Sequence, residues 1–167
     1  MGLARLAGLS LAMLSLAGLG GCGFTPLYAA PGVTPGLTHI QVMAPGGRMG
    51  FLLRQDLDDA FAHDKDGAPV YRLEMQVSQL RNARGLQVDN TAQRYELDLS
   101  VTYSLVDAAS GKTVHSGQVA SVVSYDSTAQ PYAGIAARQD TQDRLAADAA
   151  RKIQLDLAAW MATRKPG

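Results

Sequence analysis

The chain has 167 residues, with 15 Lys and Arg residues against 15 Asp and Glu residues, a hydrophobic content of 47% and one cysteine. This length and composition fit one globular domain. The balanced charge argues against a nucleic-acid-binding protein, because such proteins usually present a net basic field. One cysteine excludes an intramolecular disulfide, a redox pair of cysteines and a cysteine-based zinc site.

The first 21 residues have the layout of a secretory signal peptide. Arg5 precedes an apolar run from Leu6 to Leu19, and small residues then lead to Cys22. The run is too short and too rich in Gly, Ala and Ser for a membrane-spanning helix, which needs about 20 strongly apolar residues. We therefore predict that residues 1–21 are a leader that is removed.

The sequence Leu19-Gly20-Gly21-Cys22 resembles a bacterial lipobox, in which cleavage occurs before a lipidated cysteine. The alternative is a buried or incidental cysteine. Two or three acyl chains on Cys22 would give stable membrane anchoring, whereas one chain would be marginal. Position 23 is Gly, not the Asp that resembles an inner-membrane retention signal in enteric bacteria. The resemblance therefore implies a lipid-anchored protein of the outer membrane that faces the periplasm.

Residues 22–36 are predicted to be a tether between this anchor and the folded domain. Positions 23–36 hold three Pro and three Gly residues, a composition that disfavours both helix and central strand. Fully extended, the segment would reach on the order of 45 Å. The domain itself is expected over residues 37–167.

Hydrophobic periodicity predicts an α+β fold. The clearest period-two alternation runs from Arg94 to Leu105 and predicts a central strand, while a stripe from Met49 to Phe61 has helical spacing. The expected elements are strands at 37–43, 71–78, 94–105 and 114–125, and helices at 48–62 and 140–163, with Asp140 as the N-cap of the last helix. This β-α-β-β-β-α order predicts a two-layer sandwich, in which two helices cover one face of a four-stranded sheet.

The sequence contains no pattern that indicates catalysis. His39, His63 and His115 lie in different predicted elements, and neither an HExxH motif nor a nucleophile elbow is present. We therefore expect a protein that is not an enzyme, with no catalytic residue, no metal site and no cofactor.

Basic residues on the second and third predicted strands are the candidate ligand-binding groups. Arg72 and Arg94 share the polar register of their strands, and Arg84 lies in an expected loop at 82–90. Arginines on a solvated sheet face could bind lipid phosphates through bidentate hydrogen bonds. The alternative is a solvated face on which Glu74, Glu96 and Asp98 neutralise them. The same loop places Leu86 and Val88 in a segment that could contact a partner.

Three segments of the chain have a distinctive sequence: Gly21-Cys22-Gly23-Phe24-Thr25-Pro26-Leu27-Tyr28 at the expected mature start, Thr91-Ala92-Gln93-Arg94-Tyr95-Glu96-Leu97, and Arg138-Gln139-Asp140-Thr141-Gln142-Asp143. Together they resemble the LptE family of lipopolysaccharide-assembly lipoproteins. The resemblance implies a non-enzymatic protein that helps an LptD-type outer-membrane β-barrel to assemble, plugs it, and binds lipopolysaccharide during its insertion in the outer leaflet. By their place in the pattern, Arg94, Arg84 and Lys112 are candidate ligand-binding residues, and Arg72 joins them by its register.

Two alternatives remain open at this point. The chain could be an auxiliary lipoprotein of another envelope lipid-transport system, with a similar anchor and a different partner. A periplasmic hydrolase is disfavoured because no acid/base pair or nucleophile arrangement is present.

Overall fold

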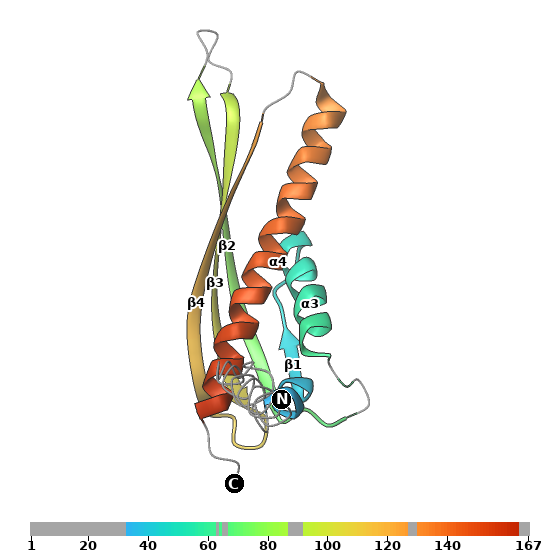
Figure 1. Cartoon of the computed structure of the whole chain (residues 1–167), viewed down its shortest axis with the longest axis vertical. Coiled ribbons are helices and arrows are strands. Elements are labelled where there is room, and N and C mark those ends of the chain that lie inside the picture. Colours follow the sequence, from blue (N-terminus) through green and yellow to red (C-terminus); the bar gives the residue numbers. More distant parts are fainter. Residues whose placement is uncertain (1–32, 63, 65–66, 87–91, 127–129, 164–167) are drawn as a thin grey trace, which may run out of the picture.

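The computed structural model in Figure 1 describes residues 33–62, 64, 67–86, 92–126 and 130–163. Cys22, the predicted leader, most of the predicted tether and Val88 lie outside these residues. The lipobox and its acylation therefore stay predictions.

The described residues form the predicted α+β sandwich. A four-stranded sheet has the order β1 (Ile40–Met43), β2 (Tyr71–Leu86), β3 (Ala92–Asp107) and β4 (Thr113–Asp126). Strand β1 is parallel to β2, and the other neighbours are antiparallel. Helices α3 (Arg48–Phe61) and α4 (Pro131–Thr163) pack on one face of the sheet, and Figure 1 shows α4 running along much of its length. This arrangement confirms the predicted fold class.

The first long helix forms where its apolar stripe predicts. Met49, Leu53, Leu57 and Phe61 recur every four residues, and all are buried. The helix ends at Ala62, which adopts the left-handed conformation with φ 49° and donates its backbone N–H to the carbonyl oxygens of Asp58 and Asp59. This ending satisfies backbone groups that the last turn would otherwise leave unpaired.

Strand β3 supplies the centre of the core, also as predicted. Its alternate residues Leu97, Leu99, Val101, Tyr103 and Leu105 are each no more than 2% exposed. Burying each of these side chains is worth about 1.5–3 kcal/mol relative to leaving it in water. Because successive side chains of a strand point to opposite faces and α4 covers one face of the sheet, every second residue of β3 faces the helices and the rest face solvent.

The start of the domain differs from the prediction. A short helix, α2 (Val33–Thr38), occupies the end of the predicted tether, and β1 begins at Ile40 instead of Leu37. Val33 and Leu37 are buried in the core, which supports the helix in spite of its composition. Pro35 is tolerated because the N–H groups of a first helical turn have no partner within the helix.

Two elements, β2 and α4, are longer than the sequence pattern predicts. Strand β2 continues to Leu86, so the whole described part of the predicted loop at 82–90, residues 82–86, belongs to a β-hairpin with β3. Helix α4 begins at Pro131, nine residues before the predicted start, and Asp140 pairs with Arg144 inside the helix instead of capping it. Within the described part of the chain, no helix is both long enough and apolar enough to cross a membrane.

Candidate functional site

The β2–β3 hairpin brings together two of the predicted ligand-binding residues. Arg84 and Arg94 lie directly opposite each other in the antiparallel register, near the distal end of the hairpin. Two facing cations on one side of a sheet repel each other unless anions lie nearby. The pairing therefore marks a place where negative charge is stabilised.

Carboxylates from neighbouring strands partly supply that charge. The Arg84 guanidinium donates to Glu96 at 2.6 Å, which raises the pKa of Arg84, and the Arg94 guanidinium donates to Asp126 at 2.9 Å. The arginine side chains remain 58% and 59% exposed. Exposed ion pairs contribute little net free energy, so an external anion can compete for both guanidinium groups.

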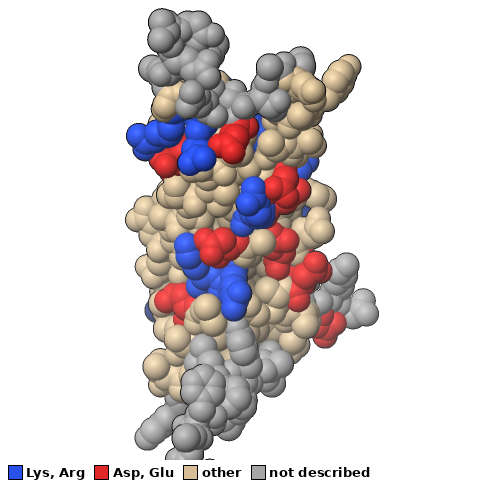
Figure 2. Space-filling view, turned by 45° about the horizontal axis from the view of Figure 1, so that its top comes forward, with Lys and Arg blue, Asp and Glu red and all other residues tan. Residues whose placement is uncertain are grey.

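The two arginines border a shallow hollow in the surface. Its volume is about 480 Å³, and it is lined by Arg84, Gly85, Arg94 and Asp126. Gly85 has φ +62°, a left-handed conformation that favours glycine. Figure 2 shows Lys and Arg side chains interleaved with Asp and Glu side chains on the face in view, so the positive charge available to a ligand is local.

The opposite face of the same hairpin carries an aromatic cluster. Arg81 lies over the Tyr95 ring, with its guanidinium carbon 4.8 Å from the ring centre, and the Tyr95 and Tyr125 rings stack at 5.6 Å. Tyr95 and Tyr125 are cross-strand partners in the β3–β4 register. This contact holds Arg81 against the sheet, on the side away from Arg84 and Arg94.

The structure separates the other two candidates from this pair. Arg72 lies near the opposite end of β2, and at about 3.3 Å per residue its position is roughly 40 Å from Arg84. It is half-buried, and its buried Nε atom has no hydrogen-bond partner among the described residues. Lys112 is exposed on the β3–β4 turn, where its carbonyl oxygen accepts from the Asp107 N–H at 2.9 Å. The four predicted residues therefore do not form one site.

A polar cluster that the sequence did not indicate joins α4 to the sheet. Asp156 accepts hydrogen bonds from the Tyr103 hydroxyl and from His115 Nε2, each at 2.6 Å, and the His115 ring stacks on Trp160 at 5.4 Å. Burial acts to raise the pKa of Asp156, but the hydrogen bonds from Tyr103 and His115 outweigh it and hold the pKa below its ordinary value. Tyr103 is buried, and its hydroxyl and His115 Nε2 are both engaged with the same carboxylate, so we interpret the cluster as a structural link between α4 and the sheet.

Metal-ligating side chains do not gather anywhere in the part of the chain that the structure describes. Within those residues, no cluster of three or more His, Cys, Asp or Glu side chains could hold a metal ion. The arrangement best suited to a ligand is therefore the facing arginine pair, whose guanidinium groups match the geometry of phosphate oxygens.

Comparison with known families gives a match over most of the domain. The family described as "LptE: Lipopolysaccharide-assembly" matches residues 37–157. A search among curated proteins gives no match.

Several solved structures are also similar to the chain. A putative lipoprotein from Caulobacter crescentus CB15 shares 52% sequence identity, with a TM-score of 0.71, over 81% of this chain and 99% of that chain. Rare lipoprotein B from Shewanella oneidensis shares 15% identity, with a TM-score of 0.55, over 72% and 92% of the two chains. A minor lipoprotein from Acinetobacter baumannii shares 16% identity, with a TM-score of 0.53, over 76% and 94%. The last two similarities establish the fold alone.

Proposed function

Because the chain belongs to the LptE, lipopolysaccharide-assembly family, we propose that it is an acylated outer-membrane lipoprotein that assists the assembly of an LptD-type β-barrel, plugs it and binds lipopolysaccharide. The role requires a membrane anchor, a surface that fits a barrel lumen and a site for an anionic lipid. Each requirement has support in the sequence or the structure.

The lipobox-like sequence before Cys22 supports the anchor. Two or three acyl chains would hold the mature protein on the membrane. The segment between Cys22 and the first described residue, Val33, would then connect the lipid to the folded domain. Both statements rest on the sequence, since this segment lies outside the described residues.

The solvated face of the sheet supports a fit to a barrel interior. Near Gln118, which donates to the Ser100 hydroxyl at 2.9 Å, this face carries mainly uncharged polar side chains on the three long strands, and the next row exposes Leu80 and Val122 on either side of Asp98. The interior of an outer-membrane barrel is also polar. Such a face can pair with barrel side chains through hydrogen bonds without burying unpaired charge. Its residues include Gln76, Ser78, Ser100, Thr102, Ser104, Ser116 and Gln118.

The facing pair of Arg84 and Arg94 is the observation that carries the lipid-binding part of the proposal. A lipid A phosphate placed in the hollow would accept hydrogen bonds from both guanidinium groups. It would compete with Glu96 and Asp126, whose ion pairs are solvent-exposed on the arginine side and therefore weak. Phosphate binding would also relieve the repulsion between the two arginines.

Titration of the full chain with purified lipopolysaccharide in mild detergent tests this assignment. We expect the double variant Arg84→Ala/Arg94→Ala to bind about tenfold or more weakly, because two charge-assisted contacts are removed. Arg54→Ala is the matched control, since Arg54 is 64% exposed on α3 and pairs only with Asp58 among the described residues. Equal affinity for the double variant and the control would refute the site.

A second titration isolates the phosphate as the group that is recognised. Lipid A from which the phosphates have been removed should bind the unmodified chain as weakly as intact lipid A binds the double variant. Undiminished binding of the dephosphorylated lipid would show that the arginines do not act through phosphate.

A further inference from the structure

Strand β2 has a long edge that no described strand covers. Strand β1 pairs with β2 only from Tyr71 to Glu74, whereas β2 continues to Leu86 and pairs with β3 along its other side. Figure 1 shows the β2–β3 hairpin extending well beyond β1 and α3. Within the described part of the chain, the edge from Met75 onward is therefore available for another strand.

The hydrogen bonds fix which backbone groups point out of this edge. The Tyr71 N–H donates to the His39 carbonyl oxygen on the β1 side at 3.2 Å. In a strand, the N–H and C=O groups of every second residue point to the same side. Val77, Gln79, Arg81 and Ala83 therefore direct their N–H and C=O groups toward the open edge.

The two edges of the sheet are protected differently. At the β4 edge, Lys152 of α4 donates through Nζ to the Ala120 carbonyl oxygen at 2.8 Å. Proteins commonly protect edge strands with lysine, proline or a covering element. The β2 segment from Met75 to Leu86 contains neither lysine nor proline, and α3 packs mainly on α4 and β1.

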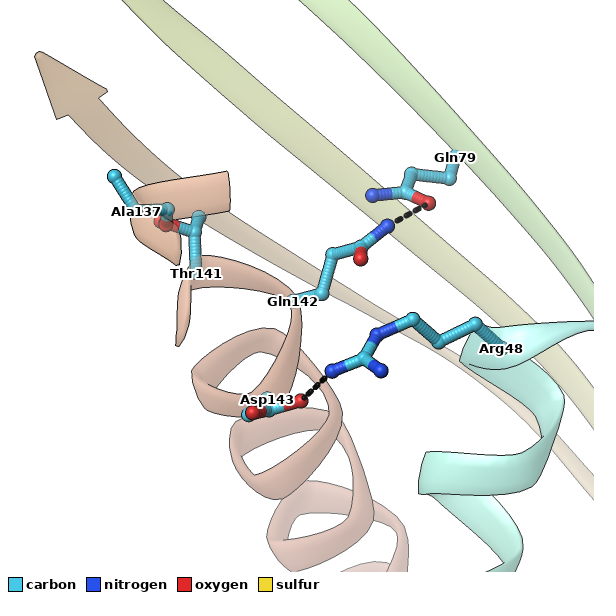
Figure 3. A network of polar contacts seen from close by, with 6 residues as sticks. All are labelled: Arg48, Gln79, Ala137, Thr141, Gln142 and Asp143. Atoms are coloured by element: carbon cyan, nitrogen blue, oxygen red, sulfur yellow. Dashed lines mark hydrogen bonds and ion pairs between the residues drawn. The ribbon is translucent and has the colours of Figure 1, made fainter. Parts of the chain in front are cut away.

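The core-facing side of this edge is polar where α4 approaches it. Figure 3 shows Gln142 of α4 donating to Gln79 of β2, at 3.5 Å, and Arg48 of α3 paired with Asp143 of α4 at 2.8 Å. The first contact joins α4 to β2 beyond the residues that β1 pairs with, and the second joins α3 to α4. An added strand would therefore meet hydrogen-bonding side chains as well as the strand backbone.

The charges along the edge select the kind of strand that fits. Between Met75 and Leu86 the charged residues are Arg81 and Arg84, both cationic. Arg84 is paired with Glu96, whereas Arg81 contacts the Tyr95 ring and has no carboxylate within ion-pair distance among the described residues. Pairing of this edge with the same edge of a second copy would bring together cations only, which is unfavourable.

We propose that the β2 edge from Val77 to Ala83 binds an extended acidic segment of a partner protein by strand addition, with a carboxylate placed near Arg81. Backbone hydrogen bonds would provide the affinity, and the carboxylate would provide the charge selectivity. The interaction uses the edge of the sheet and the aromatic side of the hairpin. It is independent of the lipid-binding site proposed for Arg84 and Arg94.

The test uses the full chain, purified in mild detergent, and two synthetic peptides of about ten residues, the length of a long strand. Both peptides alternate Val and Thr, and one carries Glu where the other carries Lys. Amide hydrogen exchange followed by NMR reports where each peptide binds. We expect the Glu peptide to protect the N–H groups of Val77, Gln79, Arg81 and Ala83, and the Lys peptide to bind more weakly.

Paired proline variants test the edge itself. Ala83→Pro removes an outward N–H from β2 without breaking the β2–β3 ladder, and we expect about tenfold weaker binding of the Glu peptide. Ala120→Pro makes the same change on the β4 edge and should leave the affinity unchanged. Arg81→Glu, which leaves the backbone intact, should reverse the preference between the peptides even if Ala83→Pro fails to fold.

Three results would overturn the proposal. The first is equal loss of binding in the two proline variants, and the second is no protection of the β2 edge at millimolar concentrations of the Glu peptide. The third is a chain that sediments as a dimer with these amides already protected, since the occupant would then be a second copy.

Discussion

Gly117 is expected to be essential for the contact between Tyr103 and Asp156. A Cβ atom at position 117 would clash with the Tyr103 hydroxyl oxygen and would lie 2.6 Å from its Cζ atom. Tyr103 is only 2% exposed, so its ring has little room to move away. Gly117→Ala should therefore displace the ring and break the 2.6 Å hydrogen bond to Asp156.

Two unfavourable changes and one favourable change determine how far Gly117→Ala should lower the free energy of unfolding. Overpacking a core costs about 1–3 kcal/mol, and losing a hydrogen bond to a charged group costs about 1.5–3 kcal/mol. Replacing Gly by Ala in a strand recovers about 0.5–1 kcal/mol. We therefore expect Gly117→Ala to lower the free energy of unfolding by about 2–4 kcal/mol, measured by urea denaturation with an unchanged m-value.

A double-mutant cycle separates this mechanism from a general effect of the substitution. Tyr103→Phe alone removes the hydrogen bond and should cost about 1.5–3 kcal/mol. Since Gly117→Ala already breaks that bond, the double variant should be more stable than the sum of the single effects predicts, by about 1.5–3 kcal/mol. Gly46→Ala is the control, because a Cβ there would meet no atom of the described part of the chain within 4 Å, and it should change stability by less than about 0.5 kcal/mol. Strict additivity of the two substitutions would show that Gly117→Ala leaves the hydrogen bond between Tyr103 and Asp156 intact.

Three further predictions concern two partly buried carboxylates, Asp156 and Asp56, and the buried side chain of Ile153. Asp156→Asn should destabilise the chain by about 1 kcal/mol at neutral pH. Because the folded-state pKa of Asp156 is depressed, the difference in the free energy of unfolding between the variant and the unmodified chain should shrink as pH falls below about 4, measured by urea titration. Burial and the charges of Asp59 and Asp143 raise the pKa of Asp56, so the ionisation of Asp56 at neutral pH opposes folding. Asp56→Asn should therefore stabilise the chain by a few tenths of a kcal/mol at neutral pH, and the gain should vanish below about pH 4. Ile153→Ala should cost about 2–4 kcal/mol in thermal or urea unfolding, whereas Leu155→Ala, at a 42% exposed position two residues away, should cost less than about 0.5 kcal/mol.

The sequence predicted those elements whose pattern comes from burial on one side. Strand β3 alternates because one face meets the helices and the other meets water, and α3 has a stripe because one face meets the core. In each case the periodicity records the packing directly. The element order and the sandwich architecture followed from these patterns.

The missed boundaries lie where that one-sided burial ends. The distal part of β2 is exposed on both faces, at Arg81, Ala83 and Arg84, so no alternation remains to indicate a strand. The first turns of α4 expose Tyr132 and Ile135, and a helix without a buried stripe has no periodic signal. Pro131 at the first helical position was the available signal, because proline is favoured there.

The candidate site was only partly predictable for a related reason. Arg84 and Arg94 were identified by residue type, but their direct opposition depends on the hairpin register, which the polar sequence of the tip does not determine. The cluster of Asp156, Tyr103 and His115 joins α4 to β3 and β4 across 41 to 53 positions. No local spacing indicates such a contact.

Isolation of the protein from bacterial membranes in mild detergent, followed by identification of the proteins that remain bound, tests whether the chain is the assembly partner of an outer-membrane barrel. We expect an LptD-type barrel to be bound in a constant ratio, and we expect this barrel to misfold when the chain is depleted while unrelated lipoproteins are normal. If the chain stays monomeric and unbound while the barrel is co-expressed, or if the barrel matures normally without the chain, the proposed function is wrong.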